Sequence, residues 1–130
     1  MVNGLNYLST RGGESSLKYE DVLLSGLSRD GGLFMPADWP TFTNSEIKDM
    51  KNLSYSELAA KIMLPFIEPS LTCDHINKIC HSTYSNFTHK EVAPLYQIKN
   101  DLYILELFHG PTLAFKDYAM QFLAKAFDEA

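Results

Sequence analysis

The sequence predicts an α+β fold, in which a mostly helical unit with a short pair of strands precedes the first strands and helix of an α/β domain. Three observations favour this class. Apolar residues recur at helical spacing between residues 16 and 86. Two Ser/Thr-x-x-Glu capping boxes mark helix starts in that region. Beyond residue 92 the pattern changes to segments rich in β-forming residues.

The first expected elements are a strand and a helix. Residues 7–10 (YLST) form the strand, and a glycine pair at 12–13 closes it. A helix follows from Ser16, and its apolar positions are Tyr19, Val22, Leu23 and Leu27. After an Asp-Gly-Gly turn, residues 33–35 run extended into Pro36. Pairing of the two extended segments should bury the apolar side chains of both.

Three further helices complete the helical unit of four. The capping boxes at 43–46 and 54–57 begin two of them, because each box satisfies free backbone donors at a helix start. The second of these has an apolar stripe made of Tyr55, Leu58, Ala59, Ile62, Met63 and Phe66. Pro65 and Pro69 should kink and then end it. Thr72 can cap the last helix, whose inner face carries Ile76, Ile79, Cys80 and Tyr84.

Two strands are expected next, at residues 92–98 and 102–108, joined by a hairpin turn at Asn100-Asp101. The second strand, LYILELF, is nearly all apolar, which suits a strand buried on both faces of a larger sheet. A final helix follows, with apolar positions Phe115, Ala119, Phe122, Leu123 and Ala126. The strand has no visible parallel neighbours, and no stop signal follows the helix. We therefore expect the front end of a longer protein.

Composition excludes several classes of partner. A formal charge of −5 and a pI near 5.2 argue against a nucleic-acid or anionic membrane surface, since both require a basic patch. No apolar run is as long as a membrane span, and the amino terminus lacks a signal-peptide pattern. We expect a cytoplasmic protein without nucleic-acid or membrane partners.

The cysteines and histidines do not predict a metal site. Cys73 and Cys80 are about 10.5 Å apart along one expected helix, too far for a disulfide, so we expect both to be reduced and Cys80 to lie in the core. Their spacing to His75, His81 and His89 fits no standard zinc pattern.

Other candidate sites also have ordinary interpretations. The Gly12-Gly13 and Gly31-Gly32 turns lack the patterns of phosphate loops. Residues 9–11 (STR) could help hold an anion, although a lone arginine beside a strand usually lies on the surface. His109 has no triad-like arrangement with Cys80 or Asp117, and we expect it to be a loop residue bonded to the backbone.

Lys116 is the residue with the clearest chemical potential. It lies beyond a strand end in a loop that opens a helix, where ligands bind in open α/β sheets. Apolar Ala114 and Phe115 flank it, and partial desolvation would favour the neutral amine that attacks a carbonyl to form a Schiff base. The Gly110-Pro111 turn could aim it. The alternative is a lysine that extends from the first helical turn into water.

The segment ELFHGPTLAFKDYAMQF, residues 106–122, resembles the cofactor-lysine segment of threonine synthases, which are fold-type II pyridoxal-phosphate enzymes. Other family-like stretches follow the expected order along the chain: YLSTRG at 7–12, GLSRDGGLFMP at 26–36, SYSELAAKIM at 54–63 and EVAPLY at 91–96. The HGPT-x-AFKD pattern is highly specific, whereas DGGLF-x-P alone is only suggestive.

The resemblance implies a threonine-synthase-type N-terminal domain at 1–92 and the start of a truncated pyridoxal-phosphate-binding α/β domain at 93–130. Lys116 matches the lysine that forms the Schiff base with pyridoxal 5'-phosphate. The implied reaction converts O-phospho-L-homoserine and water to L-threonine and phosphate, with the freed lysine moving protons. The motif neighbours expected to shape the loop and contact cofactor or substrate are His109, Thr112, Phe115 and Asp117. Tyr118 is given no role.

The family's chains are several times longer, and the groups that hold the cofactor phosphate and ring lie beyond residue 130. We therefore expect this chain alone to be inactive, with the rest of its own chain as its partner. We also expect residues 1–90 to fold independently and residues 100–130 to be poorly ordered. Two alternatives stay open: a related phospho-lyase that cleaves phosphohomoserine to a keto acid, and a non-catalytic interaction module.

Overall fold

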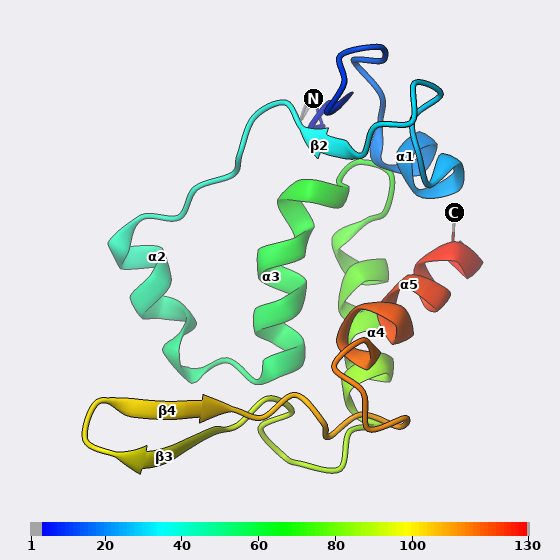
Figure 1. Ribbon diagram of the computed structural model, residues 1–130. Helices are drawn as coiled ribbons and strands as arrows, with labels where there is room; N and C mark the ends of the chain where they lie inside the picture. Colours follow the sequence, from blue (N-terminus) through cyan, green and yellow to red (C-terminus); the bar gives the residue numbers. More distant parts are fainter. Residues whose placement is uncertain (1–3, 130) are drawn as a thin grey trace.

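The computed structural model describes residues 4–129 and shows a helical body with two small antiparallel strand pairs (Figure 1). Its elements are β1 (Tyr7–Ser9), α1 (Tyr19–Ser25), β2 (Phe34–Pro36), α2 (Asn44–Asp49), the 3-10 helix η1 (Met50–Asn52), α3 (Tyr55–Ile67), α4 (Cys73–Tyr84), β3 (Leu95–Lys99), β4 (Leu102–Leu105) and α5 (Asp117–Glu129). The α+β class is confirmed. Residues 1–3 and 130, the ends of the two expected domains, lie outside the described part.

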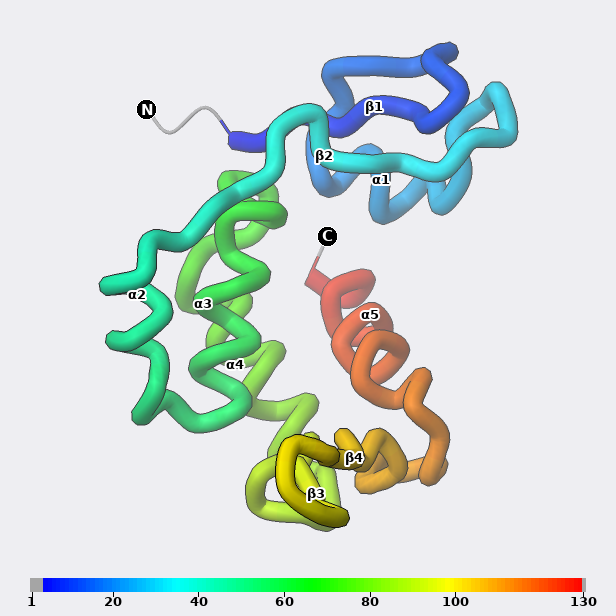
Figure 2. The backbone as a smooth tube through the Cα atoms, turned by 60° about the vertical axis from the view of Figure 1, so that its left-hand side comes forward, coloured from blue at the N-terminus to red at the C-terminus, as the bar shows by residue number. Residues whose placement is uncertain are grey.

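The core lies where α4 packs against both α3 and α5 (Figure 2). All four residues expected on the inner face of α4 are buried, and Ile76 and Cys80 are 0% exposed. Burial raises the pKa of the Cys80 thiol to about 11. Cys73 is exposed and both cysteines are free, as expected. Phe122 and Ala126 of α5 belong to the same core, so α5 packs on the helical unit, whereas poor order was expected for residues 100–130.

The expected helix caps are confirmed. Ser54 Oγ accepts the Glu57 N–H at 3.4 Å, and the Glu57 carboxylate accepts the Ser54 N–H at 2.8 Å. Thr43 caps α2 in the same way, and Thr72 Oγ1 accepts the His75 N–H. These contacts satisfy backbone donors that the first turn of each helix leaves free.

Helix α1 differs from expectation. It begins at Tyr19 rather than directly after Ser16, because Ser16 adopts a left-handed φ of 63° and the cap lies at Lys18. It ends at Ser25 with Gly26 at a φ of 70°. Leu27 therefore lies beyond the helix and is exposed rather than buried.

Strands β1 and β2 pair antiparallel, as expected, with Tyr7 opposite Pro36 and Ser9 opposite Phe34. The expectation that this pair buries its apolar strips is wrong, since Leu8 and Met35 are both exposed. Successive side chains of a strand alternate between its faces, so a strand that buries Tyr7 and Ser9 leaves Leu8 outside.

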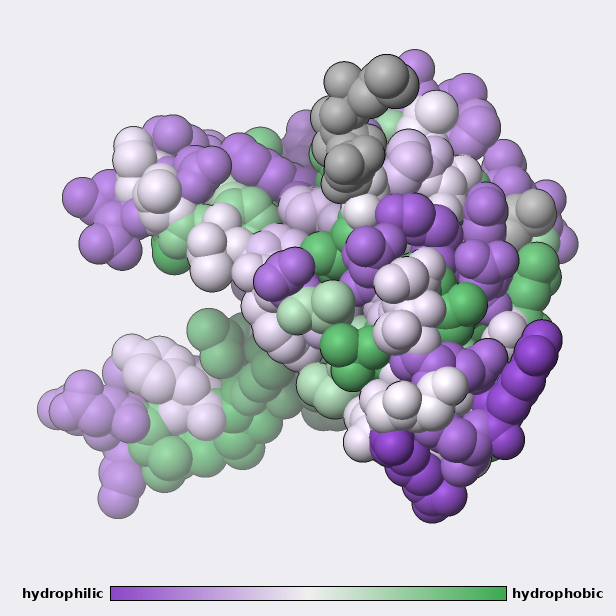
Figure 3. Space-filling model, turned by 90° about the horizontal axis from the view of Figure 1, so that it is seen from above, coloured by the Kyte–Doolittle hydropathy of each residue, from purple (hydrophilic) through white to green (hydrophobic). Residues whose placement is uncertain are grey.

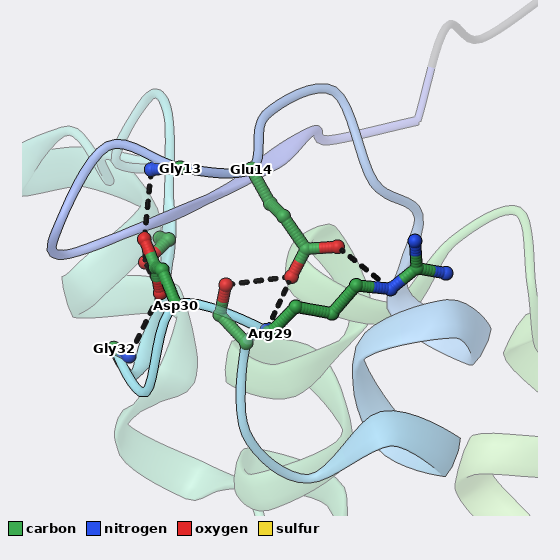
Figure 4. A network of polar contacts seen from close by, with 7 residues as sticks. Gly13, Glu14, Arg29, Asp30 and Gly32 are labelled. Atoms are coloured by element: carbon green, nitrogen blue, oxygen red, sulfur yellow. Dashed lines mark hydrogen bonds and ion pairs between the residues drawn. The ribbon is translucent and has the colours of Figure 1, made fainter.

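The two glycine turns are closed by carboxylates of the chain itself (Figure 4). The Asp30 carboxylate accepts the Ser9 hydroxyl, the Gly13 N–H at 2.7 Å and the Gly32 N–H at 2.8 Å. These hydrogen bonds, that of Ser9 foremost, hold the pKa of Asp30 well below its ordinary value. The Arg11 guanidinium donates a hydrogen bond to the Asp30 backbone carbonyl at 3.0 Å, so it stabilises the Asp-Gly-Gly turn. A negative charge occupies this position, which confirms turns rather than phosphate loops.

Strands β3 and β4 form an antiparallel hairpin that projects from the helical body (Figure 1). Every residue of both strands is exposed, and Figure 3 shows the apolar side chains of the projecting arm in green. The burial expected for residues 102–108 on two faces is thus absent, because no segment among residues 4–129 covers the hairpin. Both strands are also shorter than expected.

Candidate active site

An open cavity of about 610 Å³ lies where the hairpin leads into α5. Its walls are formed by Tyr55, Leu107, Phe115, Lys116, Tyr118, Ala119 and Met120. The volume is typical of small-molecule sites, and the lining is mostly apolar. Lys116 is the only charged residue in this lining.

Lys116 stands at the start of α5. Its carbonyl accepts the N–H of Met120 at 2.8 Å, the i to i+4 hydrogen bond with which the α-helix begins. Its expected position in the loop that opens a helix is therefore found. The expected desolvation is not found, because Lys116 and Phe115 are both exposed and the cavity is open.

The turn from Gly110 to Lys116 closes onto Asp117. The Asp117 residue is only 3% exposed, and its carboxylate accepts the Thr112 N–H at 2.7 Å and the Thr112 hydroxyl at 2.8 Å. A Cβ on Gly110 would lie 2.5 Å from the Asp117 side chain, so this close approach requires glycine. The turn also holds Leu113 at a left-handed φ of 62°. One carboxylate thus fixes the loop immediately before the lysine.

The hydrogen bonds of this turn depend on pH, because they require the ionised carboxylate of Asp117. Burial alone would raise the pKa of its carboxyl group, but hydrogen bonds, mainly from Thr112, outweigh burial and lower the pKa below its ordinary value. A lowered folded-state pKa stabilises the native state above the unfolded pKa, and this stabilisation is lost as the pH falls through the folded value.

We therefore expect the Thr112 amide proton to keep its hydrogen-bonded chemical shift at pH 5 and to lose it only at a pH below the ordinary aspartate pKa of about 4, because the pKa of Asp117 is lowered. In Asp117→Asn the shift should be altered at every pH, because an NH2 donor replaces one of the two oxygens that accept from Thr112. Proton NMR over this range checks the prediction, with Asp128→Asn, an exposed change in the same helix, as control. A Thr112 shift that is identical in Asp117→Asn and the original chain would contradict it.

His109 lies outside the cavity lining. Its Nε2 is 2.8 Å from the Glu106 carboxylate, and its ring centroid is 5.0 Å from that of His89. Its backbone carbonyl accepts the N–H and hydroxyl of Thr88 at 2.9 and 3.2 Å. The expected loop position and backbone bonding are found, and no pairing with Asp117 or Cys80 occurs.

Sequence reasoning missed Glu106, Tyr55 and the contacts of Tyr118. Glu106 and His109 are three residues apart before a Gly-Pro turn, a spacing that could have suggested the pair. Tyr55 belongs to an apolar helical stripe, and nothing in its local sequence indicates that it reaches a cavity formed more than 50 residues later.

The described residues hold neither a cluster of metal ligands nor a membrane-spanning helix. Among residues 4–129, side chains of His, Cys, Asp and Glu do not gather in a group of three that could hold a metal ion. Within that same range, no helix combines the length and apolar character required to cross a membrane.

In chain order, the described residues form a helical unit, a hairpin and a helix that begins next to the lysine of the cavity. The family model described as threonine synthase N terminus matches residues 6–84, which is more than half of the chain. The chain belongs to the threonine synthase family.

Comparison with individual threonine synthases supports the same family. The chain is 48% identical to the threonine synthase of Pseudomonas aeruginosa over 95% of this chain and 26% of that protein. It is 44% identical to the threonine synthase of Schizosaccharomyces pombe over 98% of this chain and 25% of that protein. The crystal structure of PLP-bound threonine synthase from Brucella melitensis matches with a TM-score of 0.93 and 42% identity, covering 96% of this chain and 27% of that one. The chain thus spans about a quarter of the length of these relatives.

Proposed function

We propose that this chain is the amino-terminal part of a threonine synthase, which binds pyridoxal 5'-phosphate through Lys116 and converts O-phospho-L-homoserine and water to L-threonine and phosphate. One observation carries the proposal: in a chain of this family, the single charged residue of the cavity is a lysine at a helix start. One relative of known structure, from Brucella melitensis, is PLP-bound, which supports the choice of cofactor.

The cavity fits one part of this cofactor. Lys116 would hold the cofactor through its amine, and the aromatic side chains of Tyr55 and Phe115 would supply apolar contacts from the same cavity. Among the described lining residues there is no arginine or glycine loop that would hold a phosphate. We therefore assign the phosphate contacts to the remaining part of the full-length protein, and we expect the isolated 130-residue chain to be inactive.

Each residue of the turn has its own task. When bound, pyridoxal phosphate supplies an electron sink. Lys116 holds the cofactor and, once its amine is free, carries protons to and from Cα and Cβ of the substrate. Asp117 is committed to Thr112 and so orients the loop rather than acting as the base. Phe115 contributes an apolar wall to the same cavity, and His109 supports the loop through its carbonyl.

The proposal includes a division of the chain. Residues 1–92 form the family's N-terminal domain, and residues 93–130 begin the cofactor-binding α/β domain. The partner of both is the rest of the same polypeptide, which would cover the exposed hairpin and the open cavity. We propose a cytoplasmic location for the whole enzyme.

Borohydride reduction in the presence of pyridoxal phosphate, followed by peptide mapping, tests the proposal. We expect selective label at Lys116 in the full-length protein and diffuse or no label in the 130-residue chain. Lys116→Ala should lose the label. Lys125→Ala should keep it, because Lys125 lies on the same helix with its Nζ 2.8 Å from Ser82 Oγ and does not line the cavity. Label at another lysine of the full-length protein, or none at all, would refute the assignment.

A further inference from the structure

We propose that Tyr118 is a positioning residue for Lys116, acting through the hydrogen bond from its hydroxyl group to the backbone carbonyl of Val92. The inference rests on the proposed function of Lys116. It assigns a purpose to a residue that follows the lysine by two positions and that lines the same cavity.

The Tyr118 hydroxyl stands where three segments meet. It donates to the Val92 carbonyl at 2.6 Å, and it lies 3.4 Å from the Glu106 carbonyl. A hydroxyl group has one hydrogen, so the shorter contact to Val92 is the principal bond. The phenol thereby ties the first turn of α5 to the segment before β3, close to the end of β4. Burial raises the pKa of this phenol above its ordinary value, so it remains a donor at neutral pH.

Val92 adopts a conformation that needs such support. Its φ is 61°, in the left-handed region that a β-branched residue rarely enters, and it is only 5% exposed. Such backbone strain persists only where surrounding contacts hold it. Two groups do so: the His89 carbonyl accepts the Val92 N–H at 2.9 Å, and the Tyr118 hydroxyl binds the Val92 carbonyl.

Aromatic side chains of the helical unit hold the ring of Tyr118 in place. It packs edge-on against Phe87, with ring centroids 4.8 Å apart, and against Tyr55 at 6.2 Å. The Tyr84 hydroxyl donates to the backbone carbonyl of Tyr118 at 3.0 Å. With its ring held by these neighbours, the hydroxyl bond sets how the start of α5 is rotated against the cavity wall that Tyr55 forms.

Lys116 is consequently anchored on both sides. Asp117 fixes the turn that precedes it, and Tyr118 fixes the helix that follows it. Loss of the Tyr118 hydroxyl should leave the amine of Lys116 chemically intact but less often directed at a carbonyl in the cavity. The residue would thus control how well the cofactor is captured, without contacting the reacting atoms.

A pair of Tyr→Phe variants in the full-length protein tests this. Tyr118→Phe removes a 2.6 Å hydroxyl–carbonyl bond beside Lys116. Tyr7→Phe removes a bond of the same length to the Phe66 carbonyl, and neither Tyr7 nor Phe66 lines the cavity. We expect similar decreases in the melting temperature of the cofactor-free protein. Only Tyr118→Phe should raise the dissociation constant for pyridoxal phosphate, about fivefold for the loss of one such bond. It should also slow borohydride trapping at Lys116.

The outcomes are distinguishable. If the original protein is trapped at Lys116 but both variants bind pyridoxal phosphate equally well, the positioning role of Tyr118 is overturned and the proposed function stands. If the original protein carries no label at Lys116, the proposed function fails and the role of Tyr118 fails with it. A higher dissociation constant in Tyr118→Phe alone, at matched melting temperatures, supports positioning over general stability.

Discussion

Lys116→Ala should lower the rate of L-threonine formation by the full-length protein about a thousandfold, because it removes the amine that we propose holds the cofactor and moves protons. Lys116→Arg should be as damaging. An arginine side chain keeps the positive charge but does not deprotonate at neutral pH, so it cannot supply a nucleophilic amine. Release of phosphate and of L-threonine from O-phospho-L-homoserine, measured in parallel, checks the prediction.

Lys125→Ala is the matched control, since this lysine belongs to the same helix and contacts Ser82 on α4. Its rate should stay close to that of the original protein. Retention of full activity in Lys116→Ala would refute the assignment of Lys116 as the lysine that holds the cofactor. Phosphate release that yields a keto acid in place of L-threonine would keep the lysine and replace the synthase by the phospho-lyase alternative.

Helix starts and helix faces could be predicted from the local sequence, whereas the exposure of Lys116 could not. Capping boxes act within four residues, so Thr43 and Ser54 identified helix starts correctly. The inner face of α4 was also predictable, because a period of 3.6 residues selects one side of the helix. These elements depend on interactions within one helix and its nearest neighbour.

Burial set by distant segments was not predictable. Ala114 and Phe115 are apolar, yet the neighbouring Lys116 is exposed, because desolvation depends on which segments cover the loop. The same reason leaves the apolar strand β4 exposed. At β1 the inward position went to Ser9 rather than to Leu8, since the Asp30 carboxylate accepts its hydroxyl from 21 residues away.

The candidate site was predictable only along one stretch of chain. HGPTLAFKD identified Lys116, but the walls of its cavity also come from Tyr55 of α3. The bond between Tyr118 and Val92 spans 26 residues and depends on a backbone conformation that a valine rarely adopts. Neither Tyr118 nor Val92 lies in a local sequence pattern that predicts this contact.

Phe122→Ala should destabilise the 130-residue chain by about 3 kcal/mol, because it opens a cavity in the core that α5 shares with α3 and α4. Phe127→Ala is the matched control: the same substitution in the same helix, at a residue that is 46% exposed rather than 8%. Its cost should be below about 1 kcal/mol. Urea unfolding, followed by both circular dichroism and tryptophan fluorescence, measures the two changes.

The fluorescence signal also tests how the chain divides. Trp39 is the only tryptophan, and it packs edge-on against Phe66 of α3, with ring centroids 6.1 Å apart. It therefore reports on the helical unit and not directly on α5. If Phe122→Ala moves the fluorescence and dichroism transitions together, α5 unfolds cooperatively with the helical unit. Residue 92 is then not a boundary between independently folding units. If the Trp39 transition stays where it is while α5 melts earlier, residues 1–90 fold on their own and α5 only docks on them.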